Sequence, residues 1–162
     1  MIRAMLVCLA LTLAFGCSKK EDGTASAKTA EGAKPAAGPT ALPKLGLQID
    51  VPGSVEVGNA VMGEGHMLQG ASIGAMQIEV ADKKQSIDDA KSDADMYSPK
   101  DLTADALPDG FALTYSNTGS MGKNYFVDVQ RDIGGKTYHC STTGSDPSQA
   151  QAVLAACKSL RK

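Results

Sequence analysis

Apolar residues alternate with polar ones in several short stretches of the chain, and they recur at helical spacing in two longer stretches. Strict alternation predicts half-buried strands, and a period of three to four residues predicts a helix with one apolar face. The expected strands cover residues 45–51, 55–57, 66–71, 75–81, 111–115, 125–129 and 138–142. The expected helices cover residues 86–97 and 147–160.

The residues at the helix ends support both helices. Ser86 is a suitable N-cap, and Pro99 ends the first helix because a proline disfavours helical geometry in the residue before it. Asp146 and Pro147 suit the cap and the first turn of the last helix. Between these helices, residues 100–108 show no clear period, and we expect an irregular segment that contributes Leu102 and Leu107 to the core.

The connections between the last three strands are short and contain glycine, which is typical of a meander of hairpins. Such short connections leave no room for parallel crossovers. The expected fold class is therefore α+β, with an antiparallel sheet of about six or seven strands and both helices packed on one of its faces.

The order of these elements, with Val51-Pro52-Gly53 after the first strand and a closing helix, is similar to the PsbP and Mog1-like α+β family. The resemblance covers residues 45–162 and rests on the order of the elements. That family includes photosystem subunits, a nuclear transport cofactor and many bacterial lipoproteins, so it implies a fold and leaves the function open.

The first residues form a targeting segment. Arg3 is followed by an uncharged run over residues 4–15, which is too short to span a bilayer. Its end, Leu13-Ala14-Phe15-Gly16-Cys17, resembles a bacterial lipobox. The resemblance implies that residues 1–16 are a signal peptide and that Cys17 carries the lipids. The alternative is an ordinary secretory signal that happens to contain a cysteine.

Residues 17–44 follow as the lipidated cysteine and a linker rich in Ala, Gly, Lys, Thr and Pro. Such a composition cannot bury enough apolar surface to offset the ordering entropy, so we expect a disordered tether between the membrane and a single domain at 45–162. Ser18, next to the lipidated residue, favours the outer membrane over the inner in enterobacterial lipoproteins. The expected location is the outer membrane, facing the periplasm.

The domain is mildly acidic, because residues 45–162 contain ten Lys and Arg against fifteen Asp and Glu. A nucleic-acid-binding domain would need a basic patch, so this class of partner is excluded.

Two cysteines reach the mature domain, Cys140 on the last strand and Cys157 on the apolar face of the last helix. In an oxidising compartment such a pair is expected to form a disulfide. A redox function is disfavoured, because thioredoxin-type enzymes place a Cys-x-x-Cys motif at a helix start.

Soft ligands gather around one histidine. Met62, His66 and Met67 would suit copper. Core packing by the methionines is the preferred interpretation, and we expect no bound metal or other cofactor. His139 is expected at the surface.

No motif of a hydrolase, metalloprotease or nucleotide-binding protein occurs in the chain. The sequence therefore favours a non-enzymatic interaction or assembly module, anchored to the membrane by its lipid, with an envelope protein or a glycan as its unidentified partner. The alternative is a periplasmic protein that binds a small ligand or copper.

Overall fold

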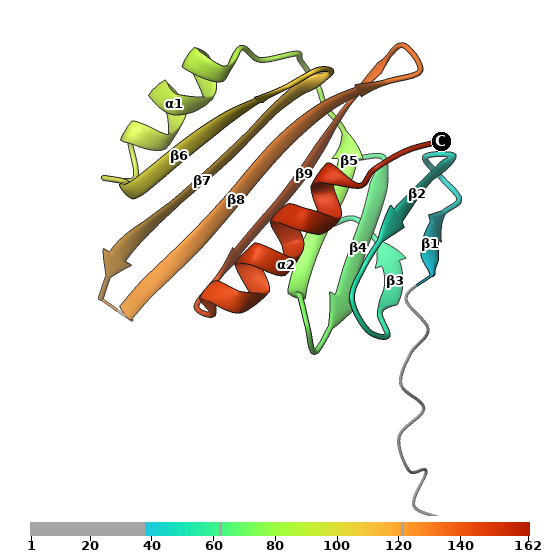
Figure 1. Ribbon diagram of the computed structural model, residues 1–162, viewed down its shortest axis with the longest axis horizontal. Coiled ribbons are helices and arrows are strands. Elements are labelled where there is room, and N and C mark those ends of the chain that lie inside the picture. Colours follow the sequence, from blue (N-terminus) through green and yellow to red (C-terminus); the bar gives the residue numbers. More distant parts are fainter. Residues whose placement is uncertain (1–37, 62, 121) are drawn as a thin grey trace, which may run out of the picture. The chain divides into compact units, whose positions relative to one another are not determined.

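The computed structural model describes residues 38–61, 63–120 and 122–162 of the 162-residue chain. In this part the protein is an α+β fold with a seven-stranded sheet, a separate two-stranded sheet and two helices (Figure 1). Every strand pairing is antiparallel, as the short connections predict.

The small sheet consists of the two strands β1 (Pro39–Leu42) and β2 (Leu47–Asp50). The order of the large sheet is β3 (Glu56–Asn59), β4 (Gly65–Gly70), β5 (Gly74–Val80), β9 (Lys136–Gly144), β8 (Gly122–Ile133), β7 (Gly110–Gly119) and β6 (Lys100–Leu107). Helix α1 (Ile87–Asp95) connects β5 to β6, and α2 (Pro147–Lys158) follows β9. The β5–β9 pairing joins the two halves of the chain.

Both predicted helix starts are confirmed. Ser86 caps α1 in a capping box, because its hydroxyl accepts from the Asp89 N–H while the Asp89 carboxylate accepts from the Ser86 N–H. Asp146 caps α2 by accepting from the backbone N–H groups of Ser148 and Gln149, and Pro147 occupies the first turn.

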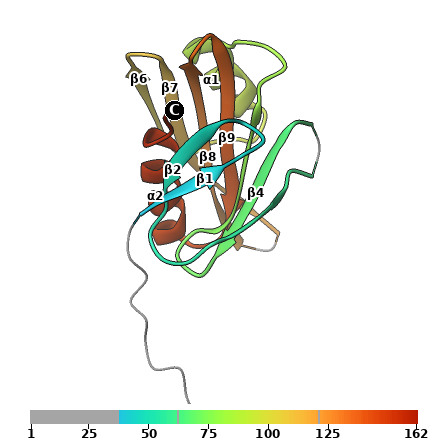
Figure 2. The same ribbon diagram turned by 90° about the vertical axis from the view of Figure 1, so that its right-hand side faces the viewer.

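The two faces of the large sheet bury different clusters. On one face, α2 and the β1–β2 sheet cover the main core, which includes Ile78, Val129, Cys140 and Val153. On the other face, α1 packs on Phe111, Leu113 and Tyr115 of β7. Figure 2 shows the two helices on opposite sides of the sheet. The expectation that both helices share one face is therefore wrong, because β7 carries apolar side chains on both of its faces.

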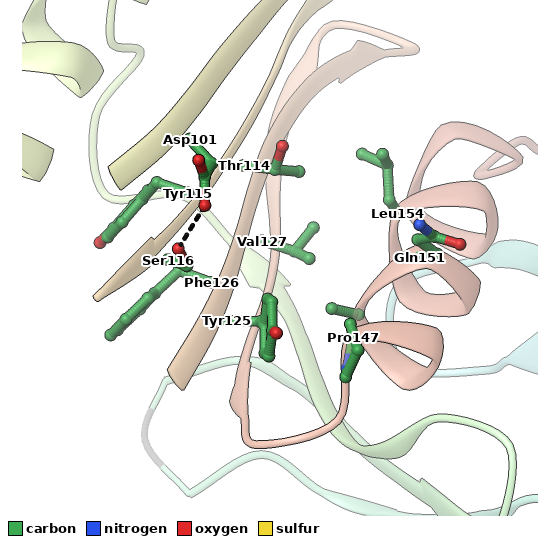
Figure 3. A pocket seen from close by; sticks show the side chains of 11 residues that line it. Asp101, Thr114, Tyr115, Ser116, Tyr125, Phe126, Val127, Pro147, Gln151 and Leu154 are labelled. Carbon is green, nitrogen blue, oxygen red and sulfur yellow. Dashed lines mark hydrogen bonds between the residues drawn. The ribbon is translucent and has the colours of Figure 1, made fainter. Parts of the chain in front are cut away.

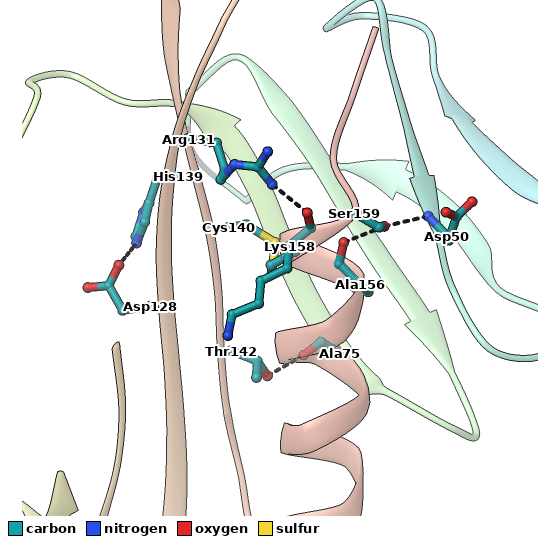
Figure 4. Close-up of a disulfide and its surroundings, with 11 residues drawn as sticks. Asp50, Ala75, Asp128, Arg131, His139, Cys140, Thr142, Ala156, Lys158 and Ser159 are labelled. Carbon is teal, nitrogen blue, oxygen red and sulfur yellow. Dashed lines mark hydrogen bonds and ion pairs between the residues drawn. A yellow bond between two sulfur atoms is a disulfide. The ribbon is translucent and has the colours of Figure 1, made fainter. Parts of the chain in front are cut away.

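Helix α2 is held to the sheet at its C-terminal end. Cys140 of β9 and Cys157 of α2 form a disulfide with their Cα atoms 5.8 Å apart, so the predicted pair is brought together (Figure 4). On the same side of the sheet, the Arg131 guanidinium bonds both carboxylate oxygens of Asp109 at 2.8 Å and donates to the backbone carbonyl of Lys158. A cation at this carbonyl also interacts favourably with the helix dipole.

The last residues return to the first hairpin. Gln48 and Arg161 exchange backbone hydrogen bonds of 2.8 and 3.0 Å, and the Arg161 guanidinium bonds both oxygens of Asp50 at 2.7 Å. Leu160 is buried in the main core beside this bridge. These contacts tie the residues after α2 to the edge of the small sheet.

Two predicted boundaries need correction. The domain does not begin at residue 45, because β1 lies within the predicted linker and its Leu42 is fully buried. Residues 100–107 form the edge strand β6 instead of an irregular segment. Leu102 and Leu107 are partly buried in the two clusters, as expected. Among the described residues, no helix is both long and apolar enough to cross a bilayer.

Candidate functional site

Among the residues that the structure describes, no helix lies over part of the large sheet. Helix α1 contacts β6 and β7, while the side chains on the same face of the strands further along point away from the main core. We call this surface the open face. It is formed by Met67, Gln69, Gln77, Glu79, Asp128, His139, Ser141 and Thr143, all of which are partly or fully exposed.

His139 occupies the centre of the open face, between two carboxylates. Its Nε2 lies 3.0 Å from Asp128 Oδ1 on β8, and its Nδ1 lies 3.5 Å from Glu79 Oε1 on β5. Figure 4 shows His139 and Asp128 on the side of β8 and β9 opposite to Cys140 and α2. The His139 side chain is 28% exposed and faces away from the main core, so this residue lies at the surface as expected, partly covered by its neighbours.

Opposing influences act on the charge of this ring. Burial by itself lowers the pKa of His139, but hydrogen bonds and charges from Asp128 and Glu79 outweigh it and hold the pKa above the ordinary value of 6.5. The site therefore favours the imidazolium form. A general base needs a nitrogen with a free lone pair, and here both ring nitrogens face carboxylates.

Two hollows adjoin His139 along the border between the open face and α1. Their volumes are about 400 and 600 Å³, and Asp93, Asp128 and His139 line both. The larger hollow also contains the carboxylates of Glu64, Glu79 and Asp82, with Lys83 as its one Lys or Arg among the described lining residues. No group of three or more His, Cys, Asp or Glu in the described part of the chain is arranged to hold a metal ion.

Aromatic rings form one wall of the smaller hollow. Tyr115 and Phe126 stack with their centroids 4.5 Å apart, and Tyr97 tilts over both at 6.4 and 5.8 Å. Burial raises the pKa of Tyr115 to about 12, so its hydroxyl stays protonated. Tyr97 follows the end of α1 and is 52% exposed, which leaves part of its ring accessible to a ligand.

A second concave region, which we call the α2 groove, lies on the opposite side of the sheet between α2 and the β7–β8 pair (Figure 3). Its volume is about 270 Å³, and Tyr125, Val127, Pro147 and Leu154 form its apolar walls.

A chain of polar contacts closes the β6 side of the α2 groove. Ser116 Oγ donates to Asp101 Oδ2 at 3.1 Å, and Lys123 Nζ lies 3.2 Å from the same oxygen. The hydrogen bond from Lys123 is the main reason that the pKa of Asp101 lies below its usual value. Asp101 adopts a positive φ of 57° at the irregular pairing near the start of β6, a conformation that is uncommon for a residue other than glycine.

The structure does not bring the proposed copper ligands together. His66 and Met67 are neighbours on β4, so their side chains point to opposite faces of the sheet. The buried His66 ring accepts from the Lys44 N–H at 3.2 Å and faces the Gly58 carbonyl at 3.1 Å, so both nitrogens have backbone partners. Met62, like Cys17, lies outside the described residues.

The grouping of carboxylates around His139 was missed because its members come from separate elements. Glu79, Asp93, Asp128 and His139 belong to β5, α1, β8 and β9, and no short motif connects them. A usable signal was the polar half of each alternating strand: Gln77 and Glu79 in one, and Asp128 in another. Such residues indicate a solvated face, without specifying which strands lie side by side.

Comparison of the chain with models of known protein families, and with the sequences of curated proteins, found no match. The function is therefore argued from the geometry above and from the N-terminal motif.

Proposed function

We propose that this protein is a bacterial lipoprotein, anchored through Cys17 in the outer membrane and facing the periplasm, whose domain is a non-enzymatic interaction or assembly module. The observation that supports this function most directly is the open face: a polar, partly exposed sheet surface on a rigid frame. The fold that we propose for the domain is PsbP/Mog1-like, on the order of its elements and its closing helix.

The frame behind the open face is well suited to hold a binding surface in one shape. Strands β4, β5, β9 and β8 pair in continuous antiparallel register. Behind them lie the main core and the Cys140–Cys157 disulfide. Binding surfaces on regular elements are held more precisely than those on loops.

The chemistry of His139 favours binding over catalysis. Its carboxylate partners engage both ring nitrogens, and a catalytic histidine would have to give up one of them before it accepted a proton. The buried His66 is likewise occupied by backbone partners. Neither histidine therefore has a nitrogen directed freely at a substrate.

The membrane anchor follows from the lipobox resemblance. Two or more acyl chains hold a protein stably on a bilayer, whereas one chain gives marginal attachment. A lipidated Cys17 with three chains would keep the domain at the membrane, so a partner would be met at high local concentration.

Two measurements in cells test the proposal. The full chain should fractionate with the outer membrane and incorporate labelled palmitate, and Cys17→Ser should abolish the labelling and release the protein from the membrane. A photo-crosslinking residue at Gln69 or Thr143 should give a discrete product with an envelope protein or glycan. The matched control is Thr103, which is exposed on the opposite face of the sheet. Membrane attachment of Cys17→Ser, or the same products from Thr103 as from Gln69, would refute it.

The α2 groove favours a second candidate function, the binding of a small ligand with an apolar body. Its apolar walls and the polar Ser116–Asp101 pair at one side are typical of small-molecule sites. Ala150 also lines the groove. Ligand-observed NMR with a fragment library should therefore detect binders that a bulky Ala150→Phe substitution displaces. Binders that are unaffected by this substitution would count against the groove.

A further inference from the structure

We infer that the open face and its two hollows bind a basic segment of a partner protein, with at least one arginine or lysine side chain in the hollows beside His139. This inference rests on the proposed interaction function and specifies the chemistry of the partner.

The first argument is the charge around the hollows. Five carboxylates line them, from Glu64, Glu79, Asp82, Asp93 and Asp128, against the single ammonium of Lys83 and the His139 ring. Like charges gathered in a concave surface reinforce one another, because the low-dielectric walls focus the field. A segment of positive charge is therefore attracted, while nucleic acids and anionic glycans are repelled.

The second argument is that the carboxylates are already held in place. Gln77 Nε2 donates to Glu79 Oε2 at 2.6 Å, and Gln85 Nε2 donates to Asp93 Oδ2 at 2.8 Å. His139 bonds Oδ1 of Asp128. Among the described residues, these contacts engage one oxygen of Asp93 and one of Asp128, so the second oxygen of each is available to a ligand. Acceptors that are fixed in advance lose little entropy when a donor arrives.

The third argument distinguishes arginine from lysine. Tyr97, which is half exposed, lines the smaller hollow together with Asp93 and Asp128. A guanidinium is planar, so it can stack flat on an aromatic ring while it offers two parallel N–H donors to a carboxylate. An ammonium is a compact point charge without this fork. The site should therefore prefer arginine.

Fluorescence anisotropy with labelled peptides tests this inference on the full chain in a non-ionic detergent. The probes are a peptide of five Arg-Gly repeats, its Lys-Gly and Glu-Gly counterparts, and a neutral chito-oligosaccharide. The Arg-Gly peptide should bind most tightly and the Glu-Gly peptide should not bind. Raising NaCl from about 50 mM to about 500 mM should weaken the binding at least tenfold, because the Debye length shrinks below the spacing of the charges.

The nearly isosteric substitutions Glu79→Gln, Asp93→Asn and Asp128→Asn locate the site. Each should lower the affinity by about twofold to fivefold, the range for partly exposed ion pairs. Tyr97→Leu should remove the preference for arginine over lysine. The matched control is Asp105→Asn, which makes the same charge change on the opposite face of the sheet and should leave the affinity unchanged. Circular dichroism establishes that each variant is folded.

Three results would overturn the inference: equal binding of the Arg-Gly and Glu-Gly peptides, equal effects of Asp105→Asn and the three site variants, or binding of the chito-oligosaccharide alone. If the basic peptide does not bind while the crosslink at Gln69 persists, the stated chemistry of the partner is wrong and the interaction function stands. If both are absent, the interaction function fails as well.

Discussion

Loss of the Cys140–Cys157 disulfide should destabilise the domain by a calculable amount. The bond closes a loop of 17 residues, and in the chain-entropy model such a crosslink stabilises the fold by about 3 kcal/mol at 25 °C. Both cysteines are fully buried, so replacing them with alanine also leaves a small cavity that costs about 1 kcal/mol more.

Urea unfolding of the full chain in detergent, followed by circular dichroism, measures these contributions separately. Oxidised wild type, reduced wild type and the double variant Cys140→Ala/Cys157→Ala should unfold in this order of decreasing stability. The first step is the loop contribution and the second is the packing contribution. For a domain of this size, about 3 kcal/mol corresponds to a fall in Tm of about 10 °C.

The dependence on urea provides an independent check. Without the crosslink the unfolded chain is more expanded and exposes more surface, so the m-value should rise. If reduced wild type were as stable as the oxidised protein, with an unchanged m-value, the reasoning from loop entropy would be refuted. If only the double variant were destabilised, the effect would belong to packing alone.

Three further predictions concern single side chains. Arg131→Met should lower the free energy of unfolding in urea by about 2 to 3 kcal/mol, because the Asp109 carboxylate loses both of its 2.8 Å hydrogen bonds and the Lys158 carbonyl loses its donor. Adding Asp109→Asn to this variant should recover part of the loss. If the effects of the two single substitutions simply add in the double variant, the pairing is contradicted. His66→Phe should lower the free energy of unfolding by about 2 to 4 kcal/mol and speed hydrogen exchange of the Lys44 amide. The control Met67→Leu, at the next residue and on the opposite face, should change the free energy of unfolding by less than about 0.5 kcal/mol. Slow exchange of the Lys44 amide in His66→Phe would disprove the assigned contact. His139 should titrate above pH 6.5 by NMR, because its pKa is raised on folding. Its contribution to stability, measured against His139→Gln, should be complete below pH 6.5 and disappear as the pH rises through the folded pKa. A titration below 6.5 would reverse the expected sign.

The alternating stretches of the sequence predict most of the sheet, because alternation reports directly on which side chains face a core. The strand β1 lacks that signal: Pro39-Thr40-Ala41-Leu42 has a single large aliphatic residue, and its burial depends on pairing with β2. Strand β6 is obscured for a different reason. Lys100, Asp101 and Asp105 are charges of the kind that protect an exposed sheet edge, and they resemble a loop in composition.

The opposite placement of the helices has a signal in the sequence. Phe111, Ala112 and Leu113 are consecutive apolar residues, and all three are buried. A run of this kind indicates a strand that is covered on both faces, whereas alternation indicates one covered face. The pairing of His139 with Asp128 and Glu79 has no comparable signal, because it depends on the lateral order of β5, β9 and β8.

The contacts made by residues 157–161 make the completed fold depend on the last helix and the residues after it. Cys157, Leu160 and Arg161 supply the crosslink, a buried core side chain and the backbone bridge to Gln48, which is separated from Arg161 by more than a hundred residues. Chains emerge from the ribosome with the N-terminus first, so β1 and β2 are made well before Arg161 can bridge Gln48. Until α2 and the residues after it have been made, the main core lacks the Leu160 side chain and cannot form its disulfide.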